Sequence, residues 1–267
     1  MLVVLPPLAA ETIFHIGNFP VTNAYINSSI AVLLFLIGGL ILRKKSALIP
    51  GKVQNFVEAI FEVFLDYIDR ITHDRKKSLK FLPLIGGVFL FILISNWMGL
   101  IPGTGSIGRF LPLHGEIELV PILRPANSDL NMTLGMALVA VFVSNILGMV
   151  TIGFFRYANK FIKIGDIIQS FKRGKTSIMV AFVEFGVGIL EIISEVAKIV
   201  SLSLRLFGNI FAGEVLLTVM AGLVAFLVPL PFMFLELLVG LIQALVFAML
   251  TLVYLAVATM PIENKAH

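Results

Sequence analysis

The sequence contains no cysteine and few charged residues. The absence of cysteine among 267 residues excludes a disulfide-stabilised scaffold, a thiolate metal site and a cysteine nucleophile. Charged residues make up 13% of the chain, well below the roughly 25% of soluble domains. Neither a glycine-rich phosphate loop nor an HExxH zinc motif is present. The sequence therefore offers no support for a self-contained nucleotidase or metalloprotease.

Apolar residues make up 58% of the chain, and the mean hydropathy is +1.02. This composition is typical of an integral membrane protein with several helical spans. The first ten residues are apolar but include no basic residue, so we expect no cleaved signal peptide. The four histidines show no metal-like spacing and are interpreted as surface or loop residues, and we expect no metal and no cofactor: His15, His73, His114 and His267.

The hydropathy pattern predicts an all-α protein forming a single membrane domain over residues 1–267. About five helices are expected in the membrane, preceded by an outer-side segment over residues 1–25. The expected membrane segments cover residues 26–42, 81–101, 130–155, 176–228 and 232–260.

Residues 53–80 are predicted to form an amphipathic helix between the first two spans. Apolar residues such as Val53, Phe64 and Ile71 recur at steps of three and four, with acidic residues such as Glu58 between them. We expect this helix to lie on the cytoplasmic surface of the membrane. Packing of a soluble helix on a partner fits the same pattern, and both could hold.

The last two membrane segments are too long to cross a bilayer upright. The 51 residues from Ile178 to Val228 include no proline and would form a helix of about 77 Å, against about 30 Å for a hydrocarbon core. Pro229 and Pro231 then predict a turn. We expect two long, steeply tilted helices that form a hairpin.

The distribution of basic residues predicts the orientation. Fifteen of the twenty Lys and Arg residues lie in three clusters, over residues 43–52, 70–80 and 156–175. One threading places all three clusters on one side, which the positive-inside rule assigns to the cytoplasm. The N-terminus is then outside and the C-terminus cytoplasmic, with the chain in the inner (plasma) membrane of the cell.

Arg205 is the first candidate functional residue, because it lies within an otherwise almost entirely apolar stretch of 85 residues, from Thr176 to Met260. A guanidinium keeps its charge in proteins, and a charge at this depth costs at least about 2.5–3.5 kcal/mol. No acidic residue lies three or four positions away, so an ion pair within the helix is the weaker explanation.

Other polar residues share one face of the same helix. Glu191, Lys198, Ser201 and Asn209 fall on the Arg205 side at 100° per residue. They could line a path for ions, or they could join helices through ion pairs, such as that of Glu191 or Glu195 with Lys198. The residue pattern leaves both readings open.

Glu214 points away from Arg205 and indicates a second polar pocket. On the last helix Glu236, Gln243 and Tyr254 share a face, and Glu236 would lie across the hairpin from Glu214. Two carboxylates in a poorly hydrated pocket repel each other, so at least one is expected to hold a proton near neutral pH, as a proton relay requires. Pairing with unlike charges elsewhere in a complex is the alternative.

Three segments resemble subunit a of F-type rotary ATP synthases of the bacterial kind. They are SLSLRLFGNIFAGE over Ser201–Glu214, LELLVGLIQALVFAMLTLVYLAVA over Leu235–Ala258, and DLNMTLGMAL over Asp129–Leu138. The order of the spans agrees over nearly the whole chain.

The resemblance implies an all-helical stator subunit that abuts a rotating ring of subunit c. Arg205 would face the ion-carrying carboxylates of that ring and separate two half-channels. Asn209, Glu214, Gln243 and Glu236 would line the outer half-channel, with Asp129 near its mouth. Glu236 departs from the family pattern, since some bacterial members carry histidine there. Residues assigned to the cytoplasmic half-channel are Glu191, Lys198 and Ser201. Tyr254 is a further candidate for ion translocation that is assigned to neither half-channel.

The same resemblance implies partners and the absence of catalysis by this chain. The expected partners are the subunit c ring, the subunit b peripheral stalk, the rest of the ATP synthase complex and the lipid bilayer, but no nucleic acid. ATP would be made or hydrolysed elsewhere in the complex, so no catalytic residue is expected here. A secondary transporter that binds an anionic substrate at Arg205, and a passive scaffold, are the alternatives. The sequence does not distinguish H⁺ from Na⁺ as the coupling ion.

Overall fold

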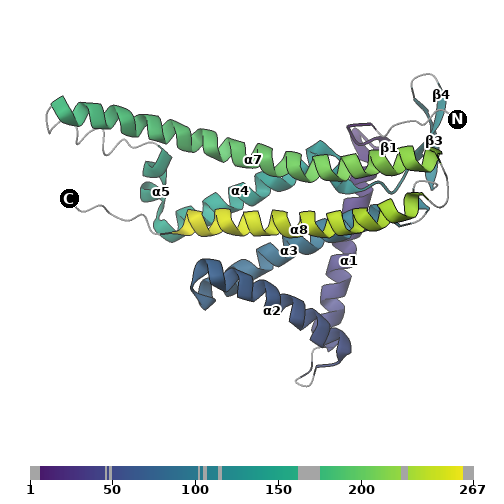
Figure 1. The fold of residues 1–267 in the computed structure, drawn as a ribbon, viewed down its shortest axis with the longest axis horizontal. Helices are drawn as coiled ribbons and strands as arrows, with labels where there is room; N and C mark the ends of the chain where they lie inside the picture. Colours follow the sequence, from purple (N-terminus) through teal and green to yellow (C-terminus); the bar gives the residue numbers. More distant parts are fainter. Residues whose placement is uncertain are drawn as a thin grey trace. The chain divides into compact units, whose positions relative to one another are not determined.

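The computed structural model describes residues 7–45, 47, 50–101, 103–104, 107–113, 116–161, 175–223 and 228–260. Within these ranges, five helices are long and apolar enough to cross a membrane, which confirms the prediction of an all-α membrane protein with about five embedded helices. They are α1 (Asn23–Lys45), α3 (Arg75–Gly99), α4 (Leu130–Ile152), α7 (Lys175–Leu223) and α8 (Pro229–Thr259) (Figure 1).

Helix α2 (Lys52–Thr72) is amphipathic, but it ends eight residues before Lys80. His73 takes a left-handed backbone conformation with φ of 51°, and the Asp74 side chain then accepts a hydrogen bond from the backbone N–H of Lys76. The sequence predicts one helix over residues 53–80, whereas the structure divides this stretch between α2 and α3. The break takes only two residues, because the left-handed C-cap of α2 at His73 is followed directly by the N-cap of α3 at Asp74. The apolar spacing continues across this short break and so does not reveal it.

Helices α2 and α3 pack against each other through aromatic and aliphatic side chains. The rings of Phe64 and Phe89 have centroids 4.7 Å apart, and Ile68 and Ile85 are fully buried. Near its start, α2 exposes the apolar side chains of Val53 and Phe56.

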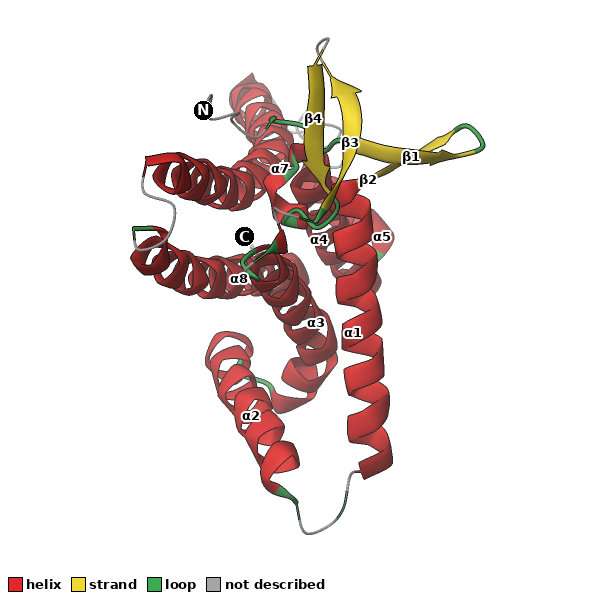
Figure 2. Cartoon of the chain, turned by 90° about the vertical axis from the view of Figure 1, so that its right-hand side faces the viewer, coloured by secondary structure: helices red, strands yellow, loops and turns green. Residues whose placement is uncertain are grey.

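Two β-hairpins, which the sequence pattern does not predict, lie beside one another (Figure 2). Strand β1 (Thr12–Ile16) pairs with β2 (Phe19–Thr22), and β3 (Gly108–Leu113) pairs with β4 (Glu116–Pro121), each antiparallel. Gly17, with φ of +62°, supplies the left-handed residue that the first turn needs. The second hairpin lies in the connection between α3 and α4.

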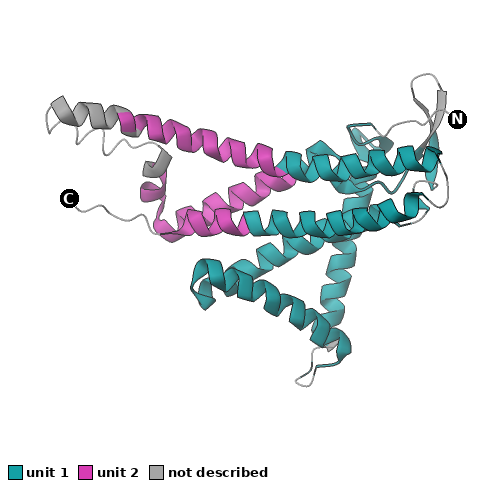
Figure 3. Cartoon of the chain, in the orientation of Figure 1, with its two compact units in different colours: residues 1–133, 203–250 teal, residues 134–202, 251–267 magenta. Residues whose placement is uncertain are grey.

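The chain forms two compact units (Figure 3). The first comprises residues 1–133 and 203–250. Its helices α3 and α8 are joined by hydrogen bonds from Asn96 Nδ2 to the Gly240 carbonyl and from Trp97 Nε1 to the Leu237 carbonyl, both 3.2 Å. A Cβ atom at Gly240 would lie only 3.2 Å from Asn96 Cβ, so the glycine permits this close approach.

The second unit comprises residues 134–202 and 251–267 and includes the short helix α5 (Phe154–Phe161). Gly153, with φ of +97°, separates α4 from α5 and turns the chain back so that Tyr157 packs on α4. A Cβ atom at Gly148 would come within 2.6 Å of both the Tyr157 ring and the Ala258 carbonyl oxygen. The missing side chain therefore makes room for a tyrosine that is only 2% exposed.

Helix α7 is continuous over 49 residues and α8 over 31, which correspond to about 74 Å and 47 Å. Both exceed the thickness of a hydrocarbon core, as the sequence predicts. Helix α8 begins at Pro229 instead of residue 232, because proline fits the first helical turn, where its missing N–H needs no partner. Residues 224–227, at the end of the first predicted long helix, lie outside the described residues.

Candidate functional site

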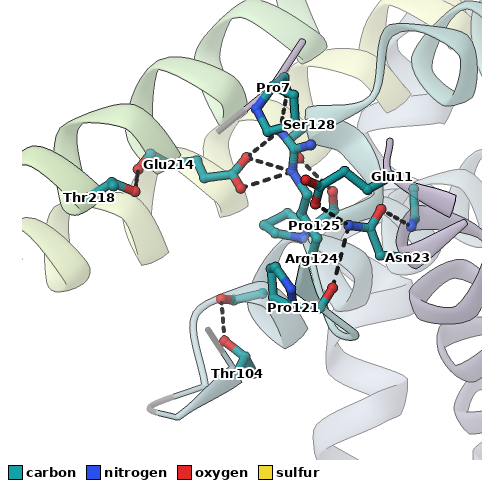
Figure 4. Close-up of polar contacts among 12 residues, drawn as sticks. Pro7, Glu11, Asn23, Thr104, Pro121, Arg124, Pro125, Ser128, Glu214 and Thr218 are labelled. Carbon is teal, nitrogen blue, oxygen red and sulfur yellow. Dashed lines mark hydrogen bonds and ion pairs between the residues drawn. The ribbon is translucent and has the colours of Figure 1, made fainter. Parts of the chain in front are cut away.

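Arg124 and Glu214 form a buried ion pair in the first unit (Figure 4). Arg124 Nε donates to Glu214 Oε1 at 2.9 Å and to Oε2 at 3.1 Å, and Nη2 donates to Oε2 at 3.0 Å. The exposed fractions of the two side chains are 2% and 18%. Because the planar guanidinium meets both carboxylate oxygens, the pair is fixed in orientation as well as in charge.

The same guanidinium also holds the N-terminal segment. Arg124 Nη2 donates to the Pro7 carbonyl at 2.7 Å, and Nη1 donates to the Ala9 carbonyl at 3.3 Å. The backbone carbonyl of Arg124 in turn accepts a hydrogen bond from Asn27 Nδ2 of α1 at 2.5 Å. Arg124 thus connects α7 with the N-terminal segment at Pro7 and Ala9 and with α1 at Asn27. All three residues precede Arg124 by more than 90 positions.

Glu236 lies across from this pair on α8 and is 5% exposed. Its carboxyl group lies against Gly213, the residue before Glu214, and any Cβ atom at position 213 would overlap that carboxyl group. The structure thus brings Glu214 and Glu236 together, as the predicted hairpin requires. We refer to Arg124, Glu214 and Glu236 as the Arg124 cluster.

The sequence reasoning did not single out Arg124, which lies between the expected membrane segments 81–101 and 130–155, on the side opposite to the three basic clusters. A signal was available, since the positive-inside rule disfavours an arginine on that side. An arginine in a loop of low charge, next to Pro125, indicates a buried carboxylate partner. Ninety residues separate that partner from Arg124, so the sequence pattern alone does not identify it.

Asp129 and Gln243 belong to the same unit but take different positions. Asp129 is 8% exposed, and its Oδ1 accepts hydrogen bonds from the backbone N–H of Asn131 at 3.2 Å and from Asn131 Nδ2 at 3.4 Å. Asp129 thus caps the first turn of α4. Gln243 is half-buried on α8, two turns beyond Glu236.

Arg205 lies on an exposed face of α7 in the isolated chain. Gly208, Asn209 and Ala212 are exposed on the same side, while Leu206 on the opposite side is buried. We refer to Arg205, Gly208, Asn209 and Ala212 as the Arg205 face. Small residues at three- and four-residue steps allow another helix to approach closely, so the face is suited to contact with a second chain.

A second polar cluster occupies the second unit. Lys198 Nζ donates to Glu195 Oε1 at 2.6 Å, and Asn145 Nδ2 of α4 donates to Glu195 Oε2 at 3.3 Å. The Lys198 ammonium also lies 5.4 Å from the ring centroid of Tyr254, a cation–π contact. These groups line a small cavity together with Ser144 and Val257. The ion-pair reading of the sequence therefore holds for Glu195 and Lys198.

Tyr157 completes this group, because its hydroxyl donates a hydrogen bond to Asn145 Oδ1. Burial, together with the negative charges of Glu195 and Glu191, raises the pKa of Tyr157 to about 12. The hydroxyl therefore remains protonated and acts as a donor. We refer to Glu195, Lys198, Asn145, Tyr157 and Tyr254 as the Lys198 cluster.

Glu191 and Ser201 are the remaining candidates for the cytoplasmic half-channel. Glu191 is half-buried, and its carboxylate contributes to the raised pKa of Tyr157. Ser201 is exposed on α7. Asn145 and Tyr157 were missed from the sequence, because an isolated polar residue on an apolar helix and a tyrosine in a basic loop carry no distinctive spacing. Tyr254 lies with Lys198 in the second unit, whereas Glu236, with which it shares a face in the sequence pattern, belongs to the first unit.

No cluster of three or more His, Asp or Glu residues that could hold a metal ion occurs among the described residues. His15 and His73 are exposed, and His114 and His267 lie outside the described ranges. The polar groups of the two clusters can hold charge and exchange protons, and they offer no nucleophile paired with a base.

Comparison with known proteins places the chain in a family. Residues 25–256 match the family described as the ATP synthase A chain. ATP synthase subunit a of Moorella thermoacetica is 30% identical over 244 residues, which cover 91% of this chain and 94% of the relative. ATP synthase subunit a of Mycobacterium ulcerans is 32% identical over 251 residues, covering 92% and 90%.

A third relative, from Propionigenium modestum, is named ATP synthase subunit a, sodium ion specific. It is 32% identical over 253 residues, covering 93% of this chain and 78% of the relative. The family match spans all five long helices and both clusters described above, at least in part. The chain therefore belongs to the subunit a family of ATP synthases, a membrane subunit of that complex whose work is ion transport linked to ATP synthesis.

Proposed function

We propose that this chain is the ion-translocating stator of the ATP synthase membrane sector and couples ion flow to rotation of a subunit c ring. The observation that carries this proposal is the Arg205 face. It presents a permanent positive charge, flanked by Gly208 and Ala212, on the exposed side of an apolar helix. A charge in this setting is stabilised by a carboxylate on a partner helix that packs closely against it.

The two polar clusters support an assignment to two half-channels. Along α7 the order is Glu195 and Lys198, then Arg205, then Glu214. In this proposal the Arg124 cluster, together with Asn209 and Gln243, belongs to the outer half-channel, and Asp129 lies near its mouth. The Lys198 cluster, with Glu191 and Ser201, belongs to the cytoplasmic one. The basic segments then face the cytoplasm, with the N-terminus outside and the chain in the inner membrane.

The proposed cycle follows from the cost of charge in lipid. An ion that enters one half-channel neutralises a ring carboxylate, which can then rotate through the lipid at low cost. After nearly a full turn the carboxyl group releases its ion into the other half-channel. The resulting carboxylate passes Arg205, which stabilises its charged form, and Arg205 also repels cations that would leak between the half-channels. Subunit b and the rest of the complex hold the stator against the torque.

The proton is the proposed coupling ion, because the Arg124 cluster contains carboxyl groups, which can gain and lose a proton. Since one relative is named as sodium ion specific, Na⁺ is the alternative that an experiment must address. Driving ATP synthesis in vesicles with a proton gradient and then with a sodium gradient distinguishes the two ions.

Replacement of Arg205 tests the proposed function. We expect Arg205→Ala to abolish ion-driven ATP synthesis in membrane vesicles while subunit a stays in the complex, as checked by immunoblotting of the purified assembly. Arg205→Lys should also fail, because an ammonium lacks the planar geometry and can lose its proton when buried. Normal synthesis by Arg205→Ala would overturn the proposal.

The absence of cysteine allows a direct test of the partner. A single cysteine introduced as Arg205→Cys should crosslink to a cysteine placed beside the ion-carrying carboxylate of subunit c. Leu206→Cys, on the buried side of α7, serves as the matched control and should give no crosslink. Equal crosslinking from both positions would contradict the proposed interface.

A further inference from the structure

Arg124 is placed so as to keep Glu214 charged. Its side chain is 2% exposed, and it donates to both carboxylate oxygens of Glu214 while also donating to the Pro7 and Ala9 carbonyls. We call this set of contacts the Arg124 bridge. A guanidinium does not release its proton in a protein, so protonation of Glu214 would leave a buried cation without its counter-charge.

Glu236 has a different environment, although it lies close by. It is 5% exposed, its carboxyl group rests against the backbone at Gly213, and no ion pair found among the described residues includes it. The charged groups around the two carboxyls are Arg124, from the segment before helix η2 (Ala126–Ser128), Glu214 from α7 and Glu236 from α8. Thr218 donates to the backbone carbonyl of Glu214 and not to its carboxylate.

Two acidic groups lie nearby and are engaged elsewhere. Glu11 of the N-terminal segment accepts a hydrogen bond from Asn23 Nδ2, and Asp129 caps α4. The only cation in these described contacts, Arg124, thus meets Glu214 alone among the carboxylates. The pair is neutral as a whole, so protonating Glu214 would expose the positive charge, whereas protonating Glu236 would remove a repulsion.

We propose that the Arg124 bridge holds Glu214 as a fixed anion, so that Glu236 is the only carboxyl of the Arg124 cluster that gains and loses the transported proton. Arg124 is then a positioning residue of the outer half-channel. Glu236 takes a proton from water on the outer side and passes it toward the ring carboxylate, while the charge on Glu214 stays constant. The inference rests on the proposed function, since it assigns roles within that half-channel.

A double-substitution experiment tests this division of roles. The assembled complex is placed in inverted membrane vesicles, the soluble head is removed, and passive proton flow is measured between pH 6 and pH 9. We expect Arg124→Gln and Glu214→Gln each to lower the flow by about tenfold or more, because each leaves a buried charge without its partner. The double variant Arg124→Gln/Glu214→Gln should recover to within about threefold of the parent and keep its pH profile, since the neutral amides can hydrogen-bond and Glu236 is intact.

Glu236→Gln is the matched comparison on the facing helix. It should abolish proton flow while Arg124 is intact, because Glu214 then stays charged. A double variant at positions 124 and 214 that assembles but conducts no better than Glu214→Gln would show that Glu214 itself carries protons, and so would overturn the inference. Proton flow near the parent level in Glu236→Gln, with Arg124 intact, would overturn it as well.

If the double variant does not assemble, Arg124→Lys tests instead whether Glu214 is a fixed anion. The ammonium keeps a positive charge beside Glu214, so the pH profile of proton flow should match the parent even if the flow is lower. A shifted profile would contradict a fixed Glu214 anion. Failure of the underlying function is distinguishable, because Arg205→Ala would then leave ion-driven ATP synthesis intact in vesicles that retain the soluble head. If Arg205 is required and only the double variant fails, the Arg124 inference alone is wrong.

Discussion

The two ion pairs on α7 differ in how they are built. Arg124–Glu214, in the first unit, joins residues 90 positions apart, and the arginine is 2% exposed. Lys198–Glu195, in the second unit, joins residues three positions apart on one helix, with exposed fractions of 22% and 16%. The first needs folded tertiary structure, whereas the second can form wherever α7 forms.

The chemistry of the two cations extends this contrast. The Arg124 guanidinium is permanently charged and held by several contacts, so its carboxylate partner has little freedom. The Lys198 ammonium is a compact charge on a flexible stem, and it shares its surroundings with Tyr254 and the Asn145 amide. The comparison suggests one cluster with a fixed charge pattern and another whose polar groups can reorient during ion transfer.

The largest expected difference between the clusters concerns stability. Arg124→Ala should lower the free energy of unfolding by about 3–5 kcal/mol, because it leaves the Glu214 carboxylate buried without a counter-charge. Lys198→Ala should cost only about 0.5 kcal/mol, the value typical of pairs three or four residues apart on a helix. Thermal release of subunit a from the purified complex measures both. Equal losses of stability in Arg124→Ala and Lys198→Ala would contradict the difference proposed between the two ion pairs.

A smaller effect is expected from the hydroxyl of Tyr157. Tyr157→Phe removes the donor to Asn145 Oδ1 and should destabilise the second unit by about 1 kcal/mol. Tyr254→Phe is the matched control, because the ring that contacts Lys198 is retained. The midpoint of thermal release should fall for Tyr157→Phe and change little for Tyr254→Phe. The reverse order would remove Tyr157 from the Lys198 cluster.

The smallest effect concerns a surface pair outside both clusters, between Asp69 and Arg75. A hydrogen bond from Ser78, and the contact and charge of Arg75, lower the pKa of Asp69. Its contribution to stability is therefore fully present above the ordinary pKa of about 3.9, and it is lost as the pH falls through the lowered value. Between neutral pH and pH 3, Asp69→Asn should weaken the acid dependence of the thermal midpoint. The exposed Asp66→Asn is the control, and an identical acid dependence for Asp69→Asn and the parent would contradict this role.

The sequence predicted the features that depend on the length of apolar stretches and on helical periodicity. The unbroken stretch after residue 175 predicted a helix that the structure extends over 49 residues, and the two prolines predicted the hairpin that brings Glu214 and Glu236 together. The isolated charge of Arg205 was visible because it is the one charged residue between Lys198 and Glu214 in the sequence. These signals are local, so one sequence is enough to detect them.

The sequence pattern did not predict the features that depend on contacts between residues far apart in the chain. The β-hairpins depend on pairing that leaves only a weak pattern in short strands, and the break between α2 and α3 depends on the backbone conformation of His73. Arg124 and Tyr157 were missed because their partners are identified by position in space and not by spacing in sequence. The assignment of residues to half-channels stays a prediction, which the substitutions above can test.

The Arg124 bridge also has a consequence for biosynthesis. Its three parts are made in the order Pro7 and Ala9, then Arg124, then Glu214. At elongation rates of 5–20 residues per second, Glu214 is synthesised roughly 5–20 seconds after Arg124. During that interval the guanidinium has the carbonyls of the N-terminal segment as partners but not its carboxylate. Arrival of α7 then completes the bridge, so the buried guanidinium gains its counter-charge only after the earlier helices have been synthesised.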